Sequence, residues 1–161
     1  MKPAIELFAE FFNQHGWSYN QASDNPVIHT GITGHNGRWR CVVDACPQDG
    51  HMLFLSLLPC TAVPNRRAAC AELLTRINSA IKHGCFLMDF EDGEIGFRTS
   101  LPPAALEASP ELVEYLVFSN LCTVDRFFAA IMKVLYADVS PKAALQPEMA
   151  ETPSTPRFEL N

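Results

Sequence analysis

The sequence predicts an α+β domain in which helices cover an antiparallel sheet, in the order α-β-β-β-α-β-β-α. Three observations lead to this fold class. Apolar residues recur at helical spacing near the start, middle and end of the chain, whereas the stretches between them alternate with period two. Asn36-Gly37 and Asp92-Gly93 are typical of tight turns between antiparallel strands. The length of 161 residues suits one domain that can bury a core.

The first helix is predicted over residues 3–15, where Phe8 and Phe12 lie at helical spacing. Gly16 is placed to end this helix. Trp17 follows at the position where a contact back onto the last helical turn is expected.

Three strands are predicted next, at 27–34, 38–46 and 51–58, and residues 47–50 form the turn between the second and third strands. The Asn36-Gly37 turn favours a type I′ hairpin that pairs His35 with Arg38. This register sets one apolar face of the sheet, which holds Ile28, Thr30, Ile32, Trp39, Cys41, Val43, Ala45, Met52, Phe54 and Leu58.

The opposite sheet face carries Leu53, Leu55 and Leu57 in the same register. An antiparallel sheet normally needs only one apolar face, so these leucines indicate that the middle strand is covered on both sides.

A second helix is predicted over 64–82 and ends at Gly84, with Arg66 and Arg67 facing solvent. Its apolar stripe is expected to contain Cys70, Leu73, Leu74, Ile77 and Ile81.

Strands at 85–90 and 94–101 follow, joined by a type I′ turn at Asp92-Gly93. This pairing places Asp89 and Arg98 diagonally across one face, as a structural ion pair. The other face is expected to hold Phe86, Met88, Phe90, Ile95, Phe97 and Leu101.

The last helix is predicted to start at Ser109-Pro110-Glu111, with the serine hydroxyl as its N-cap, and to run to about residue 137. It is apolar over most of its circumference, and a break between 120 and 125 stays open. The remaining proline-rich residues are expected to be disordered, which gives a folded domain at 1–139 and a tail at 140–161.

Composition restricts the partners and the compartment. The net charge is -6, so no basic surface is expected for nucleic acid. Glu6 and Glu10 interrupt the first apolar stretch, and the run from 52 to 58 is far shorter than a membrane span. We therefore expect a cytoplasmic protein that binds no membrane and whose six cysteines are reduced.

The candidate chemistry is sparse. The cysteine and histidine spacings do not match a structural zinc site, and we expect no metal and no cofactor. His29 and Asp44 pair across the predicted sheet near cysteines, which leaves a small enzyme or ligand-binding site as the alternative function. No serine or cysteine is placed to complete a catalytic triad, so we assign no catalytic residue.

The remaining signal is an excess of apolar residues. It is explained either by a thick core under helices on both sheet faces or by a dimer interface or partner groove. The candidate surface consists of Leu53, Leu55, Leu57, Leu116, Phe127 and Ile131.

Over residues 3–138 the chain also resembles a known family, the YbjN-like proteins, which are labelled as bacterial sensory transduction regulators. Gly16-Trp17 before the first strand and Val63-Pro64 before the second helix resemble that family. The central part of the resemblance consists of Asn78, Gly84-Cys85-Phe86-Leu87-Met88-Asp89, Asp92-Gly93-Glu94-Ile95 and Phe97-Arg98.

The resemblance implies the fold of the type III secretion chaperones, which are small, acidic, usually dimeric proteins that hold an extended segment of an effector. It implies a non-enzymatic protein-binding domain, chaperone-like or regulatory, that acts as a homodimer on a protein partner. It brings no catalytic residue with it.

Overall fold

The computed structural model describes residues 2–21, 26–45, 50–150 and 158–160. It confirms the predicted fold class, and the predicted element order is present with four additions: β1, α3, α5 and β7. The elements are α1 (Ala4–Gln14), β1 (Asn20–Gln21), β2 (Val27–Thr33), β3 (Arg38–Asp44), β4 (Met52–Thr61), the 3-10 turn η1 (Pro64–Arg66), α2 (Arg67–Ala80), β5 (Cys85–Met88), β6 (Glu94–Leu101), α3 (Pro103–Ala108), α4 (Glu111–Tyr136), α5 (Pro141–Ala150) and β7 (Glu159–Leu160).

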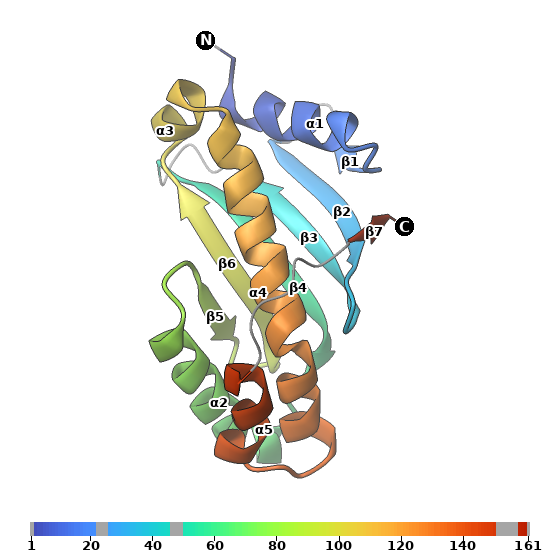
Figure 1. Ribbon diagram of the computed structural model, residues 1–161, viewed down its shortest axis with the longest axis vertical. Helices are drawn as coiled ribbons and strands as arrows, with labels where there is room; N and C mark the ends of the chain where they lie inside the picture. Colours follow the sequence, from blue (N-terminus) through green and yellow to red (C-terminus); the bar gives the residue numbers. More distant parts are fainter. Residues whose placement is uncertain (1, 22–25, 46–49, 151–157, 161) are drawn as a thin grey trace.

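The strands form one seven-stranded antiparallel sheet in the order β1-β2-β3-β4-β6-β5, and β7 also pairs with β2. The helices lie together on one face of this sheet, with α4 running diagonally across its middle (Figure 1). Among the described residues, no helix covers the other face, so the expectation that the middle strand is covered on both sides is wrong. We call the uncovered side the open face.

The β2–β3 hairpin differs from its predicted register by two residues. Thr33 pairs with Arg38, and the amide of Gly34 donates to the carbonyl of Gly37 at 2.8 Å, so the two residues between this bonded pair are His35 and Asn36 instead of the predicted Asn36 and Gly37. Because the shift is two residues, each side chain keeps its predicted face. Ile28, Ile32, Trp39, Cys41 and Val43 are accordingly buried.

The tip of this hairpin is held by α4 rather than by turn chemistry. The Asn36 amide donates to Asp125 Oδ1 at 2.8 Å, and Asn36 Nδ2 donates to the Asp125 carbonyl. Gly37 does not have a positive φ, which excludes the type I′ turn. Glycine is needed there for space, since a Cβ at Gly37 would lie 2.4 Å from the Phe128 ring.

The β5–β6 turn is longer than predicted. The Asp89 amide donates to the Glu94 carbonyl, so four residues lie in the loop, and Phe90 is 58% exposed instead of packed in the core. Arg98 pairs with Cys85 in the ladder, and the Asp89 carboxylate accepts the Glu91 amide at 2.7 Å. The predicted ion pair between Asp89 and Arg98 is therefore wrong.

The first helix ends as predicted. Gly16 adopts a φ of 67°, and the Trp17 amide donates to the Phe12 carbonyl at 2.7 Å. The Trp17 ring packs back on Phe11 and Phe12, with centroids 5.6 and 5.8 Å away.

The second predicted helix begins with η1 and continues as α2. Its two arginines do not face solvent as expected. The Arg66 guanidinium donates to the carbonyl of Val134, and that of Arg67 donates to the carbonyls of Ala62 and Phe90. Both arginines thus fasten the start of α2 to neighbouring elements.

Helix α4 is continuous over 26 residues, which resolves the open question of a break. No side chain caps its start, so the predicted role of the Ser109 hydroxyl is wrong. The helix is long and apolar enough to span a membrane by length and composition alone, but 56% of its most apolar window is buried inside the domain. That burial is typical of a core helix.

The predicted disordered tail is wrong for Pro141–Ala150, which form α5 and pack against α4 and α2. Pro141 and Ala144 are buried, and the Arg126 guanidinium donates to the Glu148 carbonyl. Proline is tolerated in the first turn of a helix, and the apolar side of α4 offers a surface for α5. Residues 151–157 and 161 lie outside the described residues.

Candidate functional site

The candidate site is the open face, where the structure leaves an apolar strip without a covering layer. Along β4 the side chains alternate, so Met52, Phe54, Ser56 and Leu58 are buried against the helices. Leu53, Leu55 and Leu57 point the other way and are only partly buried. We call these three residues the leucine strip.

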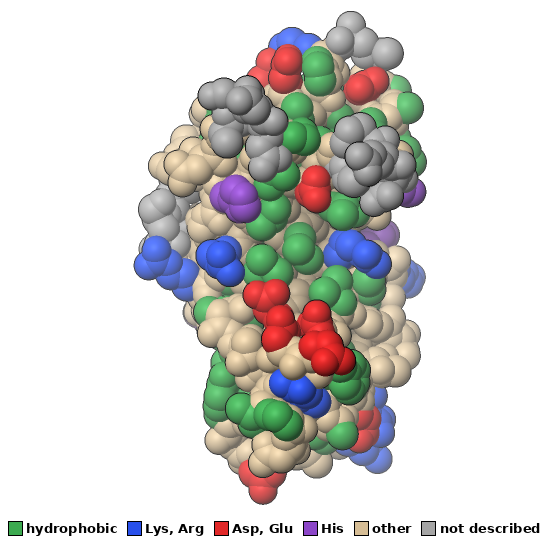
Figure 2. Space-filling view, turned by 180° about the vertical axis from the view of Figure 1, so that it is seen from behind, with side chains coloured by type: hydrophobic (Ala, Val, Ile, Leu, Met, Phe, Trp, Pro, Cys, Tyr) green, Lys and Arg blue, Asp and Glu red, His purple; other side chains and the backbone are tan. Residues whose placement is uncertain are grey.

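The neighbours of the strip are a mixture of apolar and charged side chains. Leu55 lies opposite Val42 on β3 and Arg98 on β6, and Leu57 lies opposite Arg40. Figure 2 shows apolar side chains in the middle of this face with basic side chains on either side. The open face is therefore an apolar strip with charged neighbours of both signs, since acidic side chains also lie on this face in Figure 2 and Asp44 belongs to it.

Gly96 lies beneath the β6 side of the strip and is itself buried. It is the ladder partner of Leu57, and a Cβ there would lie 3.3 Å from Leu55 Cδ1 and 3.5 Å from Leu57 Cδ2. The side chains of both leucines therefore lie over Gly96, and a side chain at this position would press on them. On the same strand, the Arg98 guanidinium lies 3.7 Å from Cys85 Sγ, so it leans toward β5 and away from the strip.

The other half of the predicted surface is wrong. Leu116, Phe127 and Ile131 on α4 are 3%, 1% and 0% exposed and belong to the core. The helix is apolar around most of its circumference because the sheet lies beneath it and α1, α2, α3 and α5 pack on its sides. Two of these covering helices, α3 and α5, were not predicted, and without them the apolar excess looked like free surface.

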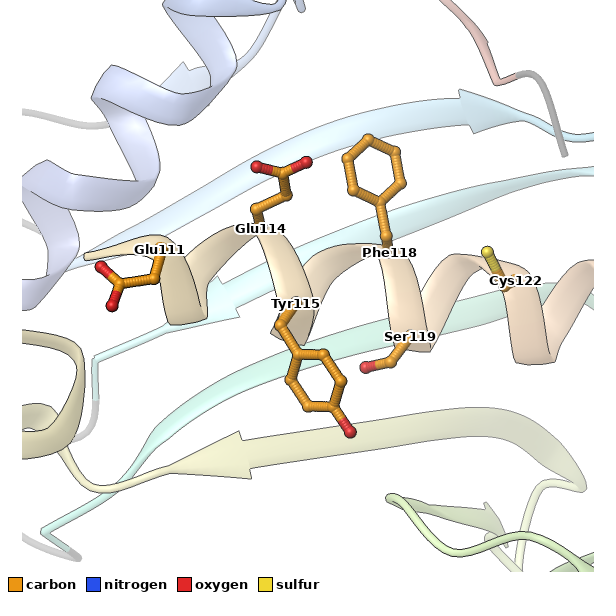
Figure 3. A pocket seen from close by; sticks show the side chains of 6 residues that line it. All are labelled: Glu111, Glu114, Tyr115, Phe118, Ser119 and Cys122. Carbon is orange, nitrogen blue, oxygen red and sulfur yellow. The ribbon is translucent and has the colours of Figure 1, made fainter. Parts of the chain in front are cut away.

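A pocket of about 430 Å³ lies over α4, and sequence reasoning did not find it. Its described lining residues are Glu111, Glu114, Tyr115, Phe118, Ser119 and Cys122. All six come from one helix, with Phe118 and Cys122 along one side and Tyr115 and Ser119 along the other (Figure 3). The Tyr115 hydroxyl lies 2.8 Å from His83 Nε2, and burial raises the pKa of the Cys122 thiol. The Ser119 hydroxyl donates to the Leu116 carbonyl rather than to a histidine, and the pocket is a shallow groove.

The residues of the alternative function are not brought together. His29 is exposed and pairs with Val42, whereas Asp44 pairs with Val27, so the predicted cross-strand pair is wrong. Cys41 lies on the covered face, where its Sγ is 3.4 Å from the Ser56 hydroxyl. Cys46 lies outside the described residues. Within the described ranges, no cluster of three or more His, Cys, Asp or Glu residues could hold a metal ion.

The thiol environments give a first prediction. Burial raises the pKa of Cys41 and of Cys60 to about 12 and that of Cys70 to about 11. At pH 8 these thiols are therefore protonated, and we expect iodoacetamide to alkylate them at least about a hundredfold more slowly in the folded protein than in urea. Peptide mass spectrometry of timed samples measures each rate. Partly exposed Cys85 is the internal control, and equal rates for Cys41 and Cys85 would contradict the buried positions.

The residues that carry the family resemblance stabilise the fold. Asn78 on α2 accepts the Phe86 amide at 2.8 Å and donates to the Phe86 carbonyl at 3.0 Å, which ties the helix to β5. Gly84 has a φ of 68°, and a Cβ there would lie 2.5 Å from the Arg98 carbonyl oxygen. Gly93 lies in the β5–β6 turn with its backbone against Ala62. These signature residues build one corner of the fold.

Comparison with known proteins gives one family. The YbjN family, described as "Putative bacterial sensory transduction regulator", matches residues 4–133. Among solved structures, the chain is similar to the one described as "Crystal structure of YbjN, a putative transcription regulator from E. coli". The TM-score is 0.57 at 16% identity, over 84% of this chain and 92% of that chain, which supports a shared fold. No curated protein matches the chain.

Proposed function

The chain belongs to the YbjN family, and from this membership together with the open face we propose that it is a non-enzymatic protein-binding domain, regulatory or chaperone-like. It acts in the cytoplasm as a homodimer and binds a protein partner through apolar and sheet-edge surface. Nucleic acid and membranes are not its partners, and it uses no cofactor. The observation that carries the proposal is the leucine strip, which no described helix covers.

Apolar burial supplies the driving force for association. Covering a leucine that is fully exposed contributes about 1.5–3 kcal/mol, and the partly buried Leu53, Leu55 and Leu57 retain a fraction of that each. The strip therefore favours a second surface of similar shape. A sheet that packs face to face on another sheet meets this requirement, because both faces are pleated in the same way.

The charges beside the strip suit a second copy of the chain. Arg40 and Asp44 lie on the open face of β3, on either side of Val42. A two-fold axis that passes near Val42 would place Arg40 of one copy against Asp44 of the other, and the same contact would form twice. The open face is thus self-complementary in charge as well as in apolar character.

Replacing Leu55 with glutamate tests this proposal. We expect the wild-type protein to have twice its chain mass of 17.9 kDa by light scattering, and the Leu55→Glu variant to have the mass of a monomer. The reason is that dimerisation would bury the new carboxylate without a partner. Because Leu55 is partly exposed in the single chain, the variant should still fold, as circular dichroism can verify.

Tyr136→Glu is the matched control, because Tyr136 is 67% exposed at the end of α4 in the helical layer. It should leave the mass unchanged. The exchange Arg40→Asp with Asp44→Arg should restore the dimer that each single change weakens. A monomeric wild-type protein, or a dimer that survives Leu55→Glu, would contradict the proposed interface.

A further inference from the structure

The two edges of the sheet differ in how their backbone groups are satisfied. At the β5 edge, the Asn78 side chain occupies both the amide and the carbonyl of Phe86. The middle of that four-residue strand is therefore closed to a further strand. An edge strand presents amides and carbonyls that pair readily with another chain. Sheet-edge binding, which is part of the proposed function, is thus directed to the opposite edge at β2.

The outer edge of β2 is covered by two short strands. At one end β1 pairs with Ile28 and His29, and the chain beside β1 is fixed because the Thr30 hydroxyl donates to the Ser18 carbonyl at 2.7 Å. At the other end β7, from the C-terminus, pairs with Ile32 and Thr33. Figure 1 shows β7 on the opposite side of α4 from α5. The described C-terminal residues therefore lie at the β2 edge of the sheet, away from α5.

The C-terminal residues contact the outer edge of β2 in the way that a bound peptide would. Backbone pairing of Glu159 and Leu160 supplies the strand contact. The partly buried Phe158 supplies an aromatic anchor, with its ring centroid 6.1 Å from that of Phe118. Phe118 in turn contacts Phe11, Trp17 and His15. Strand addition combined with a side-chain anchor is a common mode of peptide recognition.

Fewer ladder positions hold β7 than hold the longer strands. Among the described residues, two ladder positions and one ring contact join β7 and Phe158 to the domain, whereas β2 and β3 share seven ladder positions. Segments with few buried contacts open at a free energy far below that of global unfolding. The strand can therefore leave the edge while the domain stays folded.

We propose that the outer edge of β2 beside Phe118 is the docking site for an extended segment of a protein partner, and that β7 occupies this site in cis until the partner displaces it. The partner segment adds as an antiparallel strand and inserts an aromatic side chain where Phe158 packs. The inference rests on the sheet-edge part of the proposed function and is independent of the open face. It makes the C-terminus a competitive regulator of binding.

The test uses a fluorescent peptide with the sequence of residues 154–161 as a substitute for the partner segment, together with the full-length chain. We expect the peptide to bind the Phe158→Ala variant about tenfold more tightly than the wild type, because the cis competitor has lost its anchor. Fluorescence anisotropy measures the affinity. The peptide should slow amide exchange at Ile32 and Thr33, and a peptide with alanine in place of the phenylalanine should bind more weakly.

Phe90→Ala is the matched control, because Phe90 is an exposed aromatic residue in the distant β5–β6 turn. It should bind the peptide as the wild type does. Equal affinity of wild type and Phe158→Ala, or no peptide binding to either, overturns the inference. If Phe158→Ala lowers the mass from that of a dimer to that of a monomer, β7 binds the β2 edge of a second copy. The proposal that β7 occupies the edge of its own chain would then be wrong.

The two proposals can fail separately. If Leu55→Glu yields a monomer but the peptide does not compete with β7, only the edge inference falls. If the peptide competes while Leu55→Glu leaves the mass unchanged, only the open-face interface falls.

Discussion

Replacing Asn120 with alanine is expected to lower the free energy of unfolding by about 4 kcal/mol, the largest effect of any single change proposed for this domain. Asn120 is fully buried in the middle of α4. Its amide nitrogen donates to the carbonyls of Phe54 and Phe97 and to the Thr99 hydroxyl, at 3.0, 3.1 and 3.2 Å. Its oxygen accepts the Ser56 hydroxyl at 2.6 Å.

The cost follows from what the substitution leaves behind. Alanine removes the side-chain amide that hydrogen-bonds to both β4 and β6. The Ser56 hydroxyl then loses the oxygen to which it donates, in a site without water access. It still accepts a hydrogen bond from Trp39 Nε1 at 3.0 Å. Each buried polar group that loses its partner costs about 1–3 kcal/mol. The cavity left by the amide adds to this loss. Most domains of this size are stable by only about 5–15 kcal/mol, so the variant should lose a large fraction of its stability.

Urea denaturation followed by tryptophan fluorescence measures the effect. Thr123→Ala is the control on the same helix, because its hydroxyl donates within α4 to the Ser119 carbonyl and is only partly buried. That change should cost less than about 1 kcal/mol. A similar small loss for Asn120→Ala would show that the network does not hold the helix to the sheet.

Gly93→Ala is expected to cost about 3 kcal/mol, the second largest effect. Gly93 has a φ of 81°, which is strained for any residue with a Cβ. A Cβ there would also lie 2.1 Å from the Ala62 carbonyl oxygen. The Ala62 amide donates to the Gly93 carbonyl at 2.8 Å, so relief of the clash would separate two backbones that are joined by a hydrogen bond.

A comparison with Gly16→Ala separates backbone strain from steric clash as causes of the loss. Gly16 has a similar φ of 67°, but a Cβ there meets nothing within 4 Å. Its substitution should cost only the backbone strain, about 1–2 kcal/mol. The difference between the two losses, measured by urea denaturation, is the cost of the steric clash. Equal losses would mean that the turn moves away from Ala62 without penalty.

The sequence predicted the elements that depend on local pattern. The alternation in β4 correctly separated Leu53, Leu55 and Leu57 from the buried side of the strand. The Gly16-Trp17 pair correctly marked the end of α1. The family resemblance, which was assigned to 3–138, agrees with the match at 4–133.

The local sequence pattern did not predict the geometry of the turns. Asn36-Gly37 satisfies the residue preference of a type I′ turn, but Asp125, 89 residues later in the chain, binds Asn36, and the turn is centred on His35 and Asn36 instead. The Asp92-Gly93 turn is likewise fixed by contact with Ala62. In both turns the glycine is needed for close packing, which no property of neighbouring residues reveals.

The candidate site was likewise predicted only in part from the sequence. Composition and period by themselves determined that the domain has an antiparallel sheet and more apolar residues than one covered face requires. Only the tertiary structure decided where that excess is exposed. It buried Leu116, Phe127 and Ile131 in the core, and it left Leu53, Leu55 and Leu57 open because all the described helices pack on one face. The reason is that period assigns a side chain to a face of its own element, whereas exposure depends on which distant elements cover that face.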